Sequence, residues 1–197
     1  MLLAGGAGTR LGRPKALVEL GGLTLAERGV ALLRDGGADP IIVVTGAAPV
    51  SLPGIITAHN PHWRTGMGSS LREGLQTLSA ERDAVVIALV DQPLITPAAI
   101  QRLIAAFASG ARLAVACYQG KPRNPVLIGR EHWTEAAAAA RGDAGARGFL
   151  RARPALVTAV ECGDVASPDD VDTPEDLARV AALLGDPSRV PGCPRHA

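Results

Sequence analysis

LAGGAGTRLGRPK, residues 3–15, is the stretch around which the rest of the chain is organised. Four glycines fall within eight residues, and the cations Arg10, Arg13 and Lys15 precede the first carboxylate of the chain, Glu19. Glycine permits positive φ and lets a ligand approach bare amides, and successive amide N–H groups form a concavity that binds anions. The stretch predicts a phosphate-binding loop. A glycine-rich turn with incidental arginines is the alternative.

The loop matches neither of two common phosphate-binding fingerprints. A Walker A loop needs GxxxxGK[ST], whereas Lys15 is followed by Ala16. The dinucleotide fingerprint GxGxxG fits Gly6 and Gly8 but has Leu11 at its last position. We therefore expect a triphosphate cradle of another kind.

The composition narrows the class of protein. Of 197 residues, 47% are hydrophobic and 3% aromatic, which predicts one domain with an aliphatic core. A net charge of +1 argues against a surface that binds nucleic acid. No apolar run approaches the ~20 residues of a membrane span, and no signal-peptide pattern opens the chain. Because the cysteines also lack CxxC spacing, we expect a soluble cytoplasmic protein that binds neither nucleic acid nor membrane.

Strand and helix patterns alternate along the chain, which predicts an α/β fold with a mostly parallel sheet and helices on both faces. Strands are expected at 1–4, 41–44, 55–58, 84–90, 112–118, 124–128 and 156–162. Helices are expected after the capping patterns Thr24/Glu27, Ser70/Glu73, Thr96-Pro97 and Thr173-Pro174, and over 135–141. One domain is expected over 1–184, followed by a disordered tail over 185–197.

Two carboxylates stand next to predicted elements, Asp91 after a strand and Asp172 before the last helix. Asp91 follows AVVIALV and cannot stay buried without a hydrogen-bond network, a cation or a metal. Magnesium would suit it, and a turn residue ahead of Pro93 is the alternative. Asp172, in VDTPED, fits a helix cap together with Thr173, and a second metal ligand is the sharper hypothesis.

Two further segments carry polar groups suited to anions. NPHWRTGMGSSL, residues 60–71, combines glycines, hydroxyls and an asparagine ahead of a helix. GDAGAR, residues 142–147, places Arg147 near the start of a predicted helix, with a surface turn as the alternative.

LAGGAGTRLGRPK resembles the LAAGxSxRxGxxK signature of nucleotidyltransferases that activate sugars and cofactors with a nucleoside triphosphate (NTP). NPHWRTGMGSSLREGL, VDQPLITP, RNPV, GDAGAR and VDTPEDL resemble the MobA-like NTP transferase family, and within it the molybdenum cofactor cytidylyltransferase (MocA-like) branch. The guanylyltransferases are close relatives of that branch. The resemblance runs from residue 2 to about residue 184. It implies a Rossmann-like sheet of the nucleotide-diphospho-sugar transferase type that binds NTP and Mg²⁺.

The resemblance also implies roles for individual residues. Those expected at the nucleotide base and ribose are Leu3, Ala4, Gly5 and Gly6. Those expected near the acceptor are Asn60, Ser69, Ser70 and Arg147. The residues expected to carry catalysis are Lys15 and Arg10 on the triphosphate and Asp91 on Mg²⁺, with Asp172 as the candidate second metal ligand.

The implied reaction moves a nucleoside monophosphate from an NTP, CTP foremost and GTP as the alternative, to a phosphorylated acceptor. The implied acceptor is molybdopterin or the molybdenum cofactor, and pyrophosphate is the leaving group. The implied protein partner is a molybdoenzyme. A phosphate monoester is already anionic, so its attack on the α-phosphorus needs no strong base. The protein's contribution to catalysis is then to position the reactants and to neutralise charge. Two alternatives stay open: a guanylyltransferase or other NTP transferase acting on a sugar phosphate or phospholactate, and a non-catalytic chaperone that binds nucleotide or cofactor.

Overall fold

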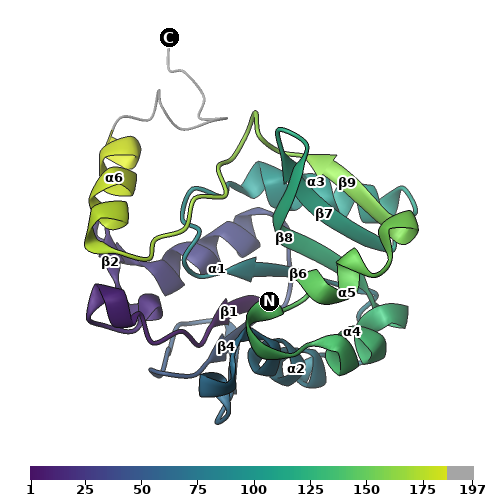
Figure 1. The fold of residues 1–197 in the computed structure, drawn as a ribbon, viewed down its shortest axis with the longest axis horizontal. Helices are drawn as coiled ribbons and strands as arrows, with labels where there is room; N and C mark the ends of the chain where they lie inside the picture. The colour runs from purple at the N-terminus through teal and green to yellow at the C-terminus, as the bar shows by residue number, and fades with distance from the viewer. Residues whose placement is uncertain (186–197) are drawn as a thin grey trace.

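The computed structural model describes residues 1–185, and these are built around one seven-stranded sheet in the order β5-β4-β1-β6-β8-β7-β9 (Figure 1). Its strands are β1 (Leu2–Ala4), β4 (Ile41–Thr45), β5 (Ile55–His59), β6 (Ala84–Leu89), β7 (Leu113–Tyr118), β8 (Lys121–Gly129) and β9 (Val157–Glu161). A separate small hairpin joins β2 (Glu19–Leu20) to β3 (Leu23–Thr24).

The predicted mostly parallel sheet is confirmed. β1 pairs in parallel with β4 and β6, β4 with β5, and β7 with β9, whereas β8 is antiparallel to β6 and β7. The reversal at β8 follows from the two-residue turn between β7 and β8. Gln119 and Gly120 have φ of 53° and 75°, and positive φ at both central residues is typical of a hairpin turn that matches the twist of the strands.

Helices cover both faces of the sheet, as predicted (Figure 1). One face carries α1 (Leu25–Asp35) and α3 (Pro97–Ala108). The other carries α2 (Met67–Thr77), α4 (Trp133–Ala139) and α5 (Arg147–Arg151). The last helix, α6 (Pro174–Gly185), buries Val180 on the α1 side. The predicted tail over 185–197 lies outside the described residues from 186 onward.

Alternation of buried side chains along the central strands divides the core between these two layers. Leu2 packs with α1 and α3, and its neighbour Leu3 packs with α2. On β6, Val86 packs in the layer of α1 and α3, and Ile87 packs in the layer of α2. Successive strand residues point to opposite faces, so a continuous apolar run is the pattern of a strand covered on both sides. No helix among residues 1–185 is both long and apolar enough to cross a membrane.

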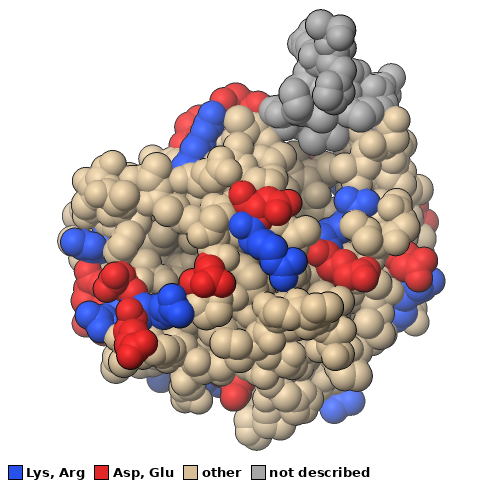
Figure 2. Space-filling model, turned by 180° about the vertical axis from the view of Figure 1, so that it is seen from behind, with Lys and Arg blue, Asp and Glu red and all other residues tan. Residues whose placement is uncertain are grey.

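The surface charges are mixed on the face opposite to that of Figure 1. Figure 2 shows acidic and basic side chains interspersed there, among wide uncharged areas. This distribution agrees with the small net charge of the chain.

Capping residues set the start of α1 as the sequence predicts, but the start of α2 differs. Thr24 Oγ1 accepts from the Glu27 amide at 3.2 Å, and the Thr24 amide donates to the Glu27 carboxylate at 2.7 Å. At α2 the predicted Ser70/Glu73 cap is wrong, because the helix begins at Met67 and Ser70 lies in its first turn.

Replacing Thr24 with alanine is expected to lower the free energy of unfolding by about 1 kcal/mol, because an N-cap hydroxyl satisfies an otherwise unpaired amide. Urea denaturation of wild type and variant measures the change. Thr24→Ser keeps the hydroxyl and is expected to retain most of the stability. Equal losses in the two variants would show that the methyl group, and not the cap, accounts for the effect.

The strand order decides where the functional segments meet. β1 lies between β4 and β6, and all three run in parallel, so their carboxyl ends share one edge. The glycine-rich loop leaves β1 at that edge, and Asp91 follows β6 there. The strand order reverses at β1, with β4 on one side of it and β6 on the other. Open α/β sheets bind ligands at the carboxyl ends of the strands beside such a reversal.

Candidate active site

The glycine-rich loop folds back on itself, so that its two ends lie together. The Lys15 amide donates to the Gly6 carbonyl at 3.2 Å. Gly8 has φ of +59°, and a Cβ there would lie 2.1 Å from the Arg13 carbonyl oxygen. Only glycine fits such a position. The fold of the loop brings Lys15 to the bare backbone of Gly6, where both line one cleft.

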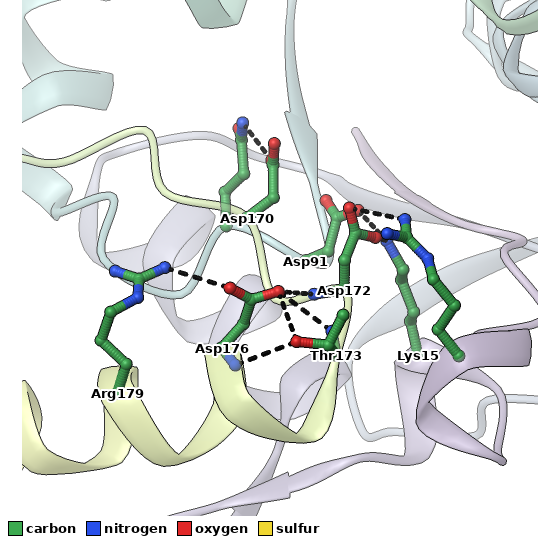
Figure 3. Close-up of polar contacts among 9 residues, drawn as sticks. Lys15, Asp91, Asp170, Asp172, Thr173, Asp176 and Arg179 are labelled. Carbon is green, nitrogen blue, oxygen red and sulfur yellow. Dashed lines mark hydrogen bonds and ion pairs between the residues drawn. The ribbon is translucent and has the colours of Figure 1, made fainter.

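Lys15 joins two carboxylates from distant parts of the chain (Figure 3). Its Nζ lies 2.6 Å from Asp91 Oδ2 and 2.5 Å from Asp172 Oδ1. Arg10 adds a second cation, with its guanidinium 3.0 Å from Asp172 Oδ2. The structure therefore brings together four residues that sequence analysis selected for the triphosphate and the metal.

A helix cap fixes the backbone beside Asp172. Asp176 accepts from the amides of Asp172 and Thr173 at 3.2 and 3.0 Å, and its own amide donates to Thr173 Oγ1 at 3.2 Å (Figure 3). Thr173 and Asp176 thus form the reciprocal cap of α6. This arrangement leaves the Asp172 carboxylate to Lys15 and Arg10, so Asp172 is not the capping side chain.

Two adjoining cavities, of about 280 and 710 Å³, open around this cluster, and Gly6, Lys15 and Asp91 line both. The predicted residues that line only the smaller cavity are Leu3, Gly5 and Ser70. Those that line only the larger cavity are Arg10, Arg147 and Asp172. Those that line neither are Ala4, Asn60 and Ser69.

Asn60 and Ser69 hold the start of α2 in place. Asn60 is buried, and its Nδ2 donates to Ser69 Oγ at 2.8 Å and to Ser70 Oγ at 3.0 Å. Its Oδ1 accepts from the His62 amide at 2.9 Å. Ser69 donates to the Gly66 carbonyl at 2.8 Å. These bonds position Ser70 at the wall of the smaller cavity, while Ala4 packs in the core of β1.

Several cleft residues were not singled out from the sequence. They are Trp63, Arg64, Met67, Gln92, Arg123, Asp143 and Asp170. The Arg64 guanidinium lies 4.4 Å from the centre of the Trp63 ring, a cation–π contact at the cavity wall. Sequence signals existed for most of them. The predicted anion-binding segment contains Trp63, Arg64 and Met67, and the quoted motifs VDQPLITP, RNPV and GDAGAR contain Gln92, Arg123 and Asp143.

Burial and charge act in opposite directions on the cluster. Burial alone would lower the pKa of Lys15, but the charge of Asp91 and the bond to Asp172 outweigh it and raise that pKa above its ordinary value. The hydrogen bond from Lys15 holds the pKa of Asp172 below its ordinary value. Burial, together with the charge of Asp91, raises the pKa of Asp170, although Gln92 donates to that carboxylate at 2.9 Å. Lys15 and Asp172 therefore stabilise each other's charged forms.

The stability that this pairing contributes should depend on pH. A depressed pKa at Asp172 stabilises the fold above the ordinary aspartate value, about 3.9, and this contribution is lost as pH falls through the depressed pKa. The raised pKa of Lys15 also stabilises the fold, and this contribution is lost at alkaline pH, as pH rises through that pKa. We expect the melting-temperature difference between wild type and Asp172→Asn to be constant near neutral pH and to shrink below about pH 4. A difference that persists unchanged into strong acid would contradict this assignment.

The cluster also meets the chemical requirements of a hard divalent cation. Asp91 Oδ1 is buried and has no hydrogen-bond partner within the described residues. A cation beside it would satisfy that oxygen. No group of three or more His, Cys, Asp and Glu residues within 1–185 is arranged to hold a metal. Two carboxylates still suffice for Mg²⁺, which typically binds one or two carboxylates together with substrate phosphates. The residues present therefore fit Mg²⁺ that arrives with a nucleotide.

The family model of the MobA-like NTP transferase domain matches residues 1–158. The chain belongs to this family of nucleotidyltransferases. It is 36% identical over 194 residues to nicotine blue oxidoreductase of Paenarthrobacter nicotinovorans, covering 91% of this chain and 94% of that protein. It is 30% identical over 199 residues to molybdenum cofactor guanylyltransferase of Rhodobacter capsulatus, covering 93% and 95%.

Solved structures of other proteins share the fold. A homologue of Mycobacterium tuberculosis Rv0371c from Mycobacterium sp. strain JC1 is 30% identical and has a TM-score of 0.81, covering 93% of this chain and 94% of that one. Rv0371c in complex with manganese is 25% identical and has a TM-score of 0.73, covering 92% and 96%. The family and the Rossmann-like fold implied by the sequence motifs are both confirmed.

Proposed function

We propose that the protein transfers a nucleoside monophosphate from CTP or GTP to a phosphorylated acceptor of the molybdopterin type and releases pyrophosphate. The observation that carries this proposal is the position of Lys15. Its ammonium group lies at the bare backbone of the glycine-rich loop and contacts two carboxylates, Asp91 and Asp172. Cations and carboxylates in one cleft suit a polyphosphate that arrives with its own metal ion.

Lys15 and Arg10 bind the triphosphate in this account. Both line the larger cavity and form ion pairs with Asp172. The phosphates of the bound nucleotide would replace Asp172 as the partner of these two cations. The amides of Gly6 and Gly8 add neutral donors at the same wall. As pyrophosphate leaves, negative charge collects on it, and cations placed there beforehand lower the barrier.

Asp91 and Asp172 would hold Mg²⁺ in this account. The metal supplies charge neutralisation on the phosphate oxygens when it is bound. The support from this chain is the buried Asp91 Oδ1, which has no hydrogen-bond partner among residues 1–185. The manganese complex of Rv0371c gives parallel support from a structural neighbour.

The acceptor needs no protein base, because its phosphate oxygen is already charged near neutral pH. The cleft agrees with this requirement: among residues 1–185, no histidine or cysteine lines either cavity. The protein's contribution is then to align the acceptor phosphate with the α-phosphorus and to neutralise charge. Arg123 and Arg147, at the far side of the larger cavity, are placed to bind the acceptor phosphate.

Pyrophosphate release tests the proposal. Purified protein is incubated with Mg²⁺, molybdopterin and CTP, GTP, UTP or ATP in turn, and the nucleotide adduct is identified by mass spectrometry. We expect release with CTP or GTP only, dependent on both metal and acceptor. Nucleotide binding without release of pyrophosphate would favour a non-catalytic carrier. Release with a sugar phosphate or phospholactate in place of molybdopterin would favour another transferase of the family.

A second candidate is an oxidoreductase, favoured by the 36% identity to nicotine blue oxidoreductase across most of both chains. The same loop could hold the pyrophosphate of a nicotinamide dinucleotide, because its amides and cations recognise phosphate in either ligand. Oxidation of NADH or NADPH in the presence of the dye nicotine blue tests this candidate. Dye-dependent oxidation without any pyrophosphate release would replace the transferase proposal.

A further inference from the structure

A strap of residues 162–173 connects β9 to α6 and carries Asp172 to the candidate active site (Figure 1). It contains no helix or strand, so it has no ladder of backbone hydrogen bonds of its own. Just before Asp172, the Val171 amide donates to the Asp91 carbonyl at 2.8 Å. The position of Asp172 therefore depends on how the strap is attached to the turn that follows β6.

Two side chains of that turn bind the strap. Thr96 Oγ1 donates to the Val165 carbonyl at 2.9 Å, near the β9 end of the strap. Gln92 Nε2 donates to the Pro168 carbonyl at 3.3 Å and to Asp170 Oδ1 at 2.9 Å, beside the cleft (Figure 3). Thr96 and Gln92 thus make similar bonds to the same segment, but only Gln92 does so close to the candidate metal ligand.

Gln92 is a buried polar side chain, only 5% exposed. Burying an amide is unfavourable unless it is hydrogen-bonded. Among residues 1–185, both side-chain bonds of Gln92 go to the strap, and its Oε1 has no partner. An apolar side chain of the same length could fill this space, but it would leave the strap without these bonds.

The bond to Asp170 also affects the charges of the site. Lys15 contacts Asp91 and Asp172. Asp170 lines the same cavity, but within the described residues it forms no ion pair, and Gln92 is the only donor to its carboxylate. Because opposite charges attract, a released Asp170 would compete with Asp172 for Lys15. The bond from Gln92 holds that third carboxylate in place and leaves Lys15 to Asp172.

From these contacts we propose that Gln92 is a positioning residue that sets Asp172 at Lys15 and, in the proposed function, at the metal ion. It acts through the strap and through Asp170, without contact with the reacting atoms. The metal part of this inference rests on the proposed function. The placement of Asp172 does not, because it can be measured without nucleotide or metal.

A cycle of double substitutions tests the placement of Asp172. Gln92→Met keeps the length of the side chain and removes the donor. In wild type, Asp172→Asn should lower the melting temperature, and in Gln92→Met we expect this loss to fall to less than about half, because substitutions within one network are not additive. In Thr96→Val, which removes the strap bond remote from Asp172, the loss should equal that in wild type. An equal loss in all three backgrounds would overturn the proposal.

Binding of nucleotide with and without metal tests the second part. The probes are CTP and GTP, alone and as their Mn²⁺ complexes, titrated by calorimetry. We expect Gln92→Met to weaken the metal complex by about tenfold, because residues that orient a metal ligand commonly have effects of this size. It should change metal-free binding less than about twofold, and Thr96→Val should change neither more than that. Equal losses with and without metal would show direct contact with the nucleotide and overturn the positioning role.

Gln92→Glu separates the donor from the shape of the side chain. It has nearly the same shape as glutamine but places a carboxylate opposite Asp170, so its losses should be at least as large as those of Gln92→Met. Wild-type behaviour of Gln92→Glu in both measurements would overturn the proposal. A wild type that binds no nucleotide, together with the expected coupling to Asp172→Asn, would support the role of Gln92 and overturn the transferase proposal alone.

Discussion

Lys15→Ala is expected to lower the rate of nucleotidyl transfer by about 10³-fold or more, or about 4 kcal/mol in barrier height. In the structure Lys15 contacts both Asp91 and Asp172, with its side chain only 16% exposed. Charge on the leaving pyrophosphate would collect at this point, and alanine offers nothing to neutralise it. Pyrophosphate release at saturating NTP and Mg²⁺ measures the effect.

Arg13→Ala is the matched control for this substitution. Arg13 belongs to the same loop and is exposed, but it lines neither active-site cavity. Its removal should leave the rate within about twofold of wild type, in line with the small effects of substitutions away from special features. Far-ultraviolet circular dichroism checks that Lys15→Ala remains folded. A near-normal rate in folded Lys15→Ala would refute the mechanism.

Asp91→Asn is expected to lower turnover by about 10²-fold to 10⁴-fold and to weaken the response of the rate to Mg²⁺. The substitution keeps the shape of the side chain but removes the charge that Lys15, and by our proposal the metal, require. The Asp91 side chain is 17% exposed and Oδ1 is buried, so water cannot substitute for the lost carboxylate. The rate measured against Mg²⁺ concentration tests this expectation.

The control lies at the other end of the same strand. Asp83 precedes β6 at its amino end and is exposed, whereas Asp91 follows β6 at its carboxyl end. Asp83→Asn removes the same charge from the protein without touching the cleft, and its rate and Mg²⁺ dependence should match those of wild type. A similar loss in both variants would point to net charge instead of a specific site.

Local patterns were enough to predict most of the elements. The run IIVV predicted β4, and the Thr24/Glu27 pattern predicted the start of α1, because backbone preference and side-chain capping act over a few residues. The start of α2 was misplaced, because Ser69 and Ser70 bond Asn60 across a loop and do not cap the helix. The antiparallel β8 was not predicted either, since strand direction depends on the turn at Gln119 and Gly120.

The candidate site was only partly visible in the sequence. The glycine-rich loop and Asp91 could be placed near each other once both were assigned to the carboxyl ends of parallel strands. Asp172 could not be separated from a helix cap, because Thr173 and Asp176 also fit that role and only the fold shows which side chains form the cap. Arg123 and Asp143 lie in the quoted motifs RNPV and GDAGAR, but only long-range packing shows that their side chains reach the cleft.

The measurement that tests the central claim most directly is isothermal titration of CTP and GTP into wild type and Lys15→Ala, each with and without Mg²⁺. The account predicts that wild type binds at least one of these nucleotides, that Mg²⁺ strengthens the binding, and that Lys15→Ala loses about tenfold or more of the affinity. Equal affinity in both proteins, or no binding of either nucleotide to wild type, would contradict the account.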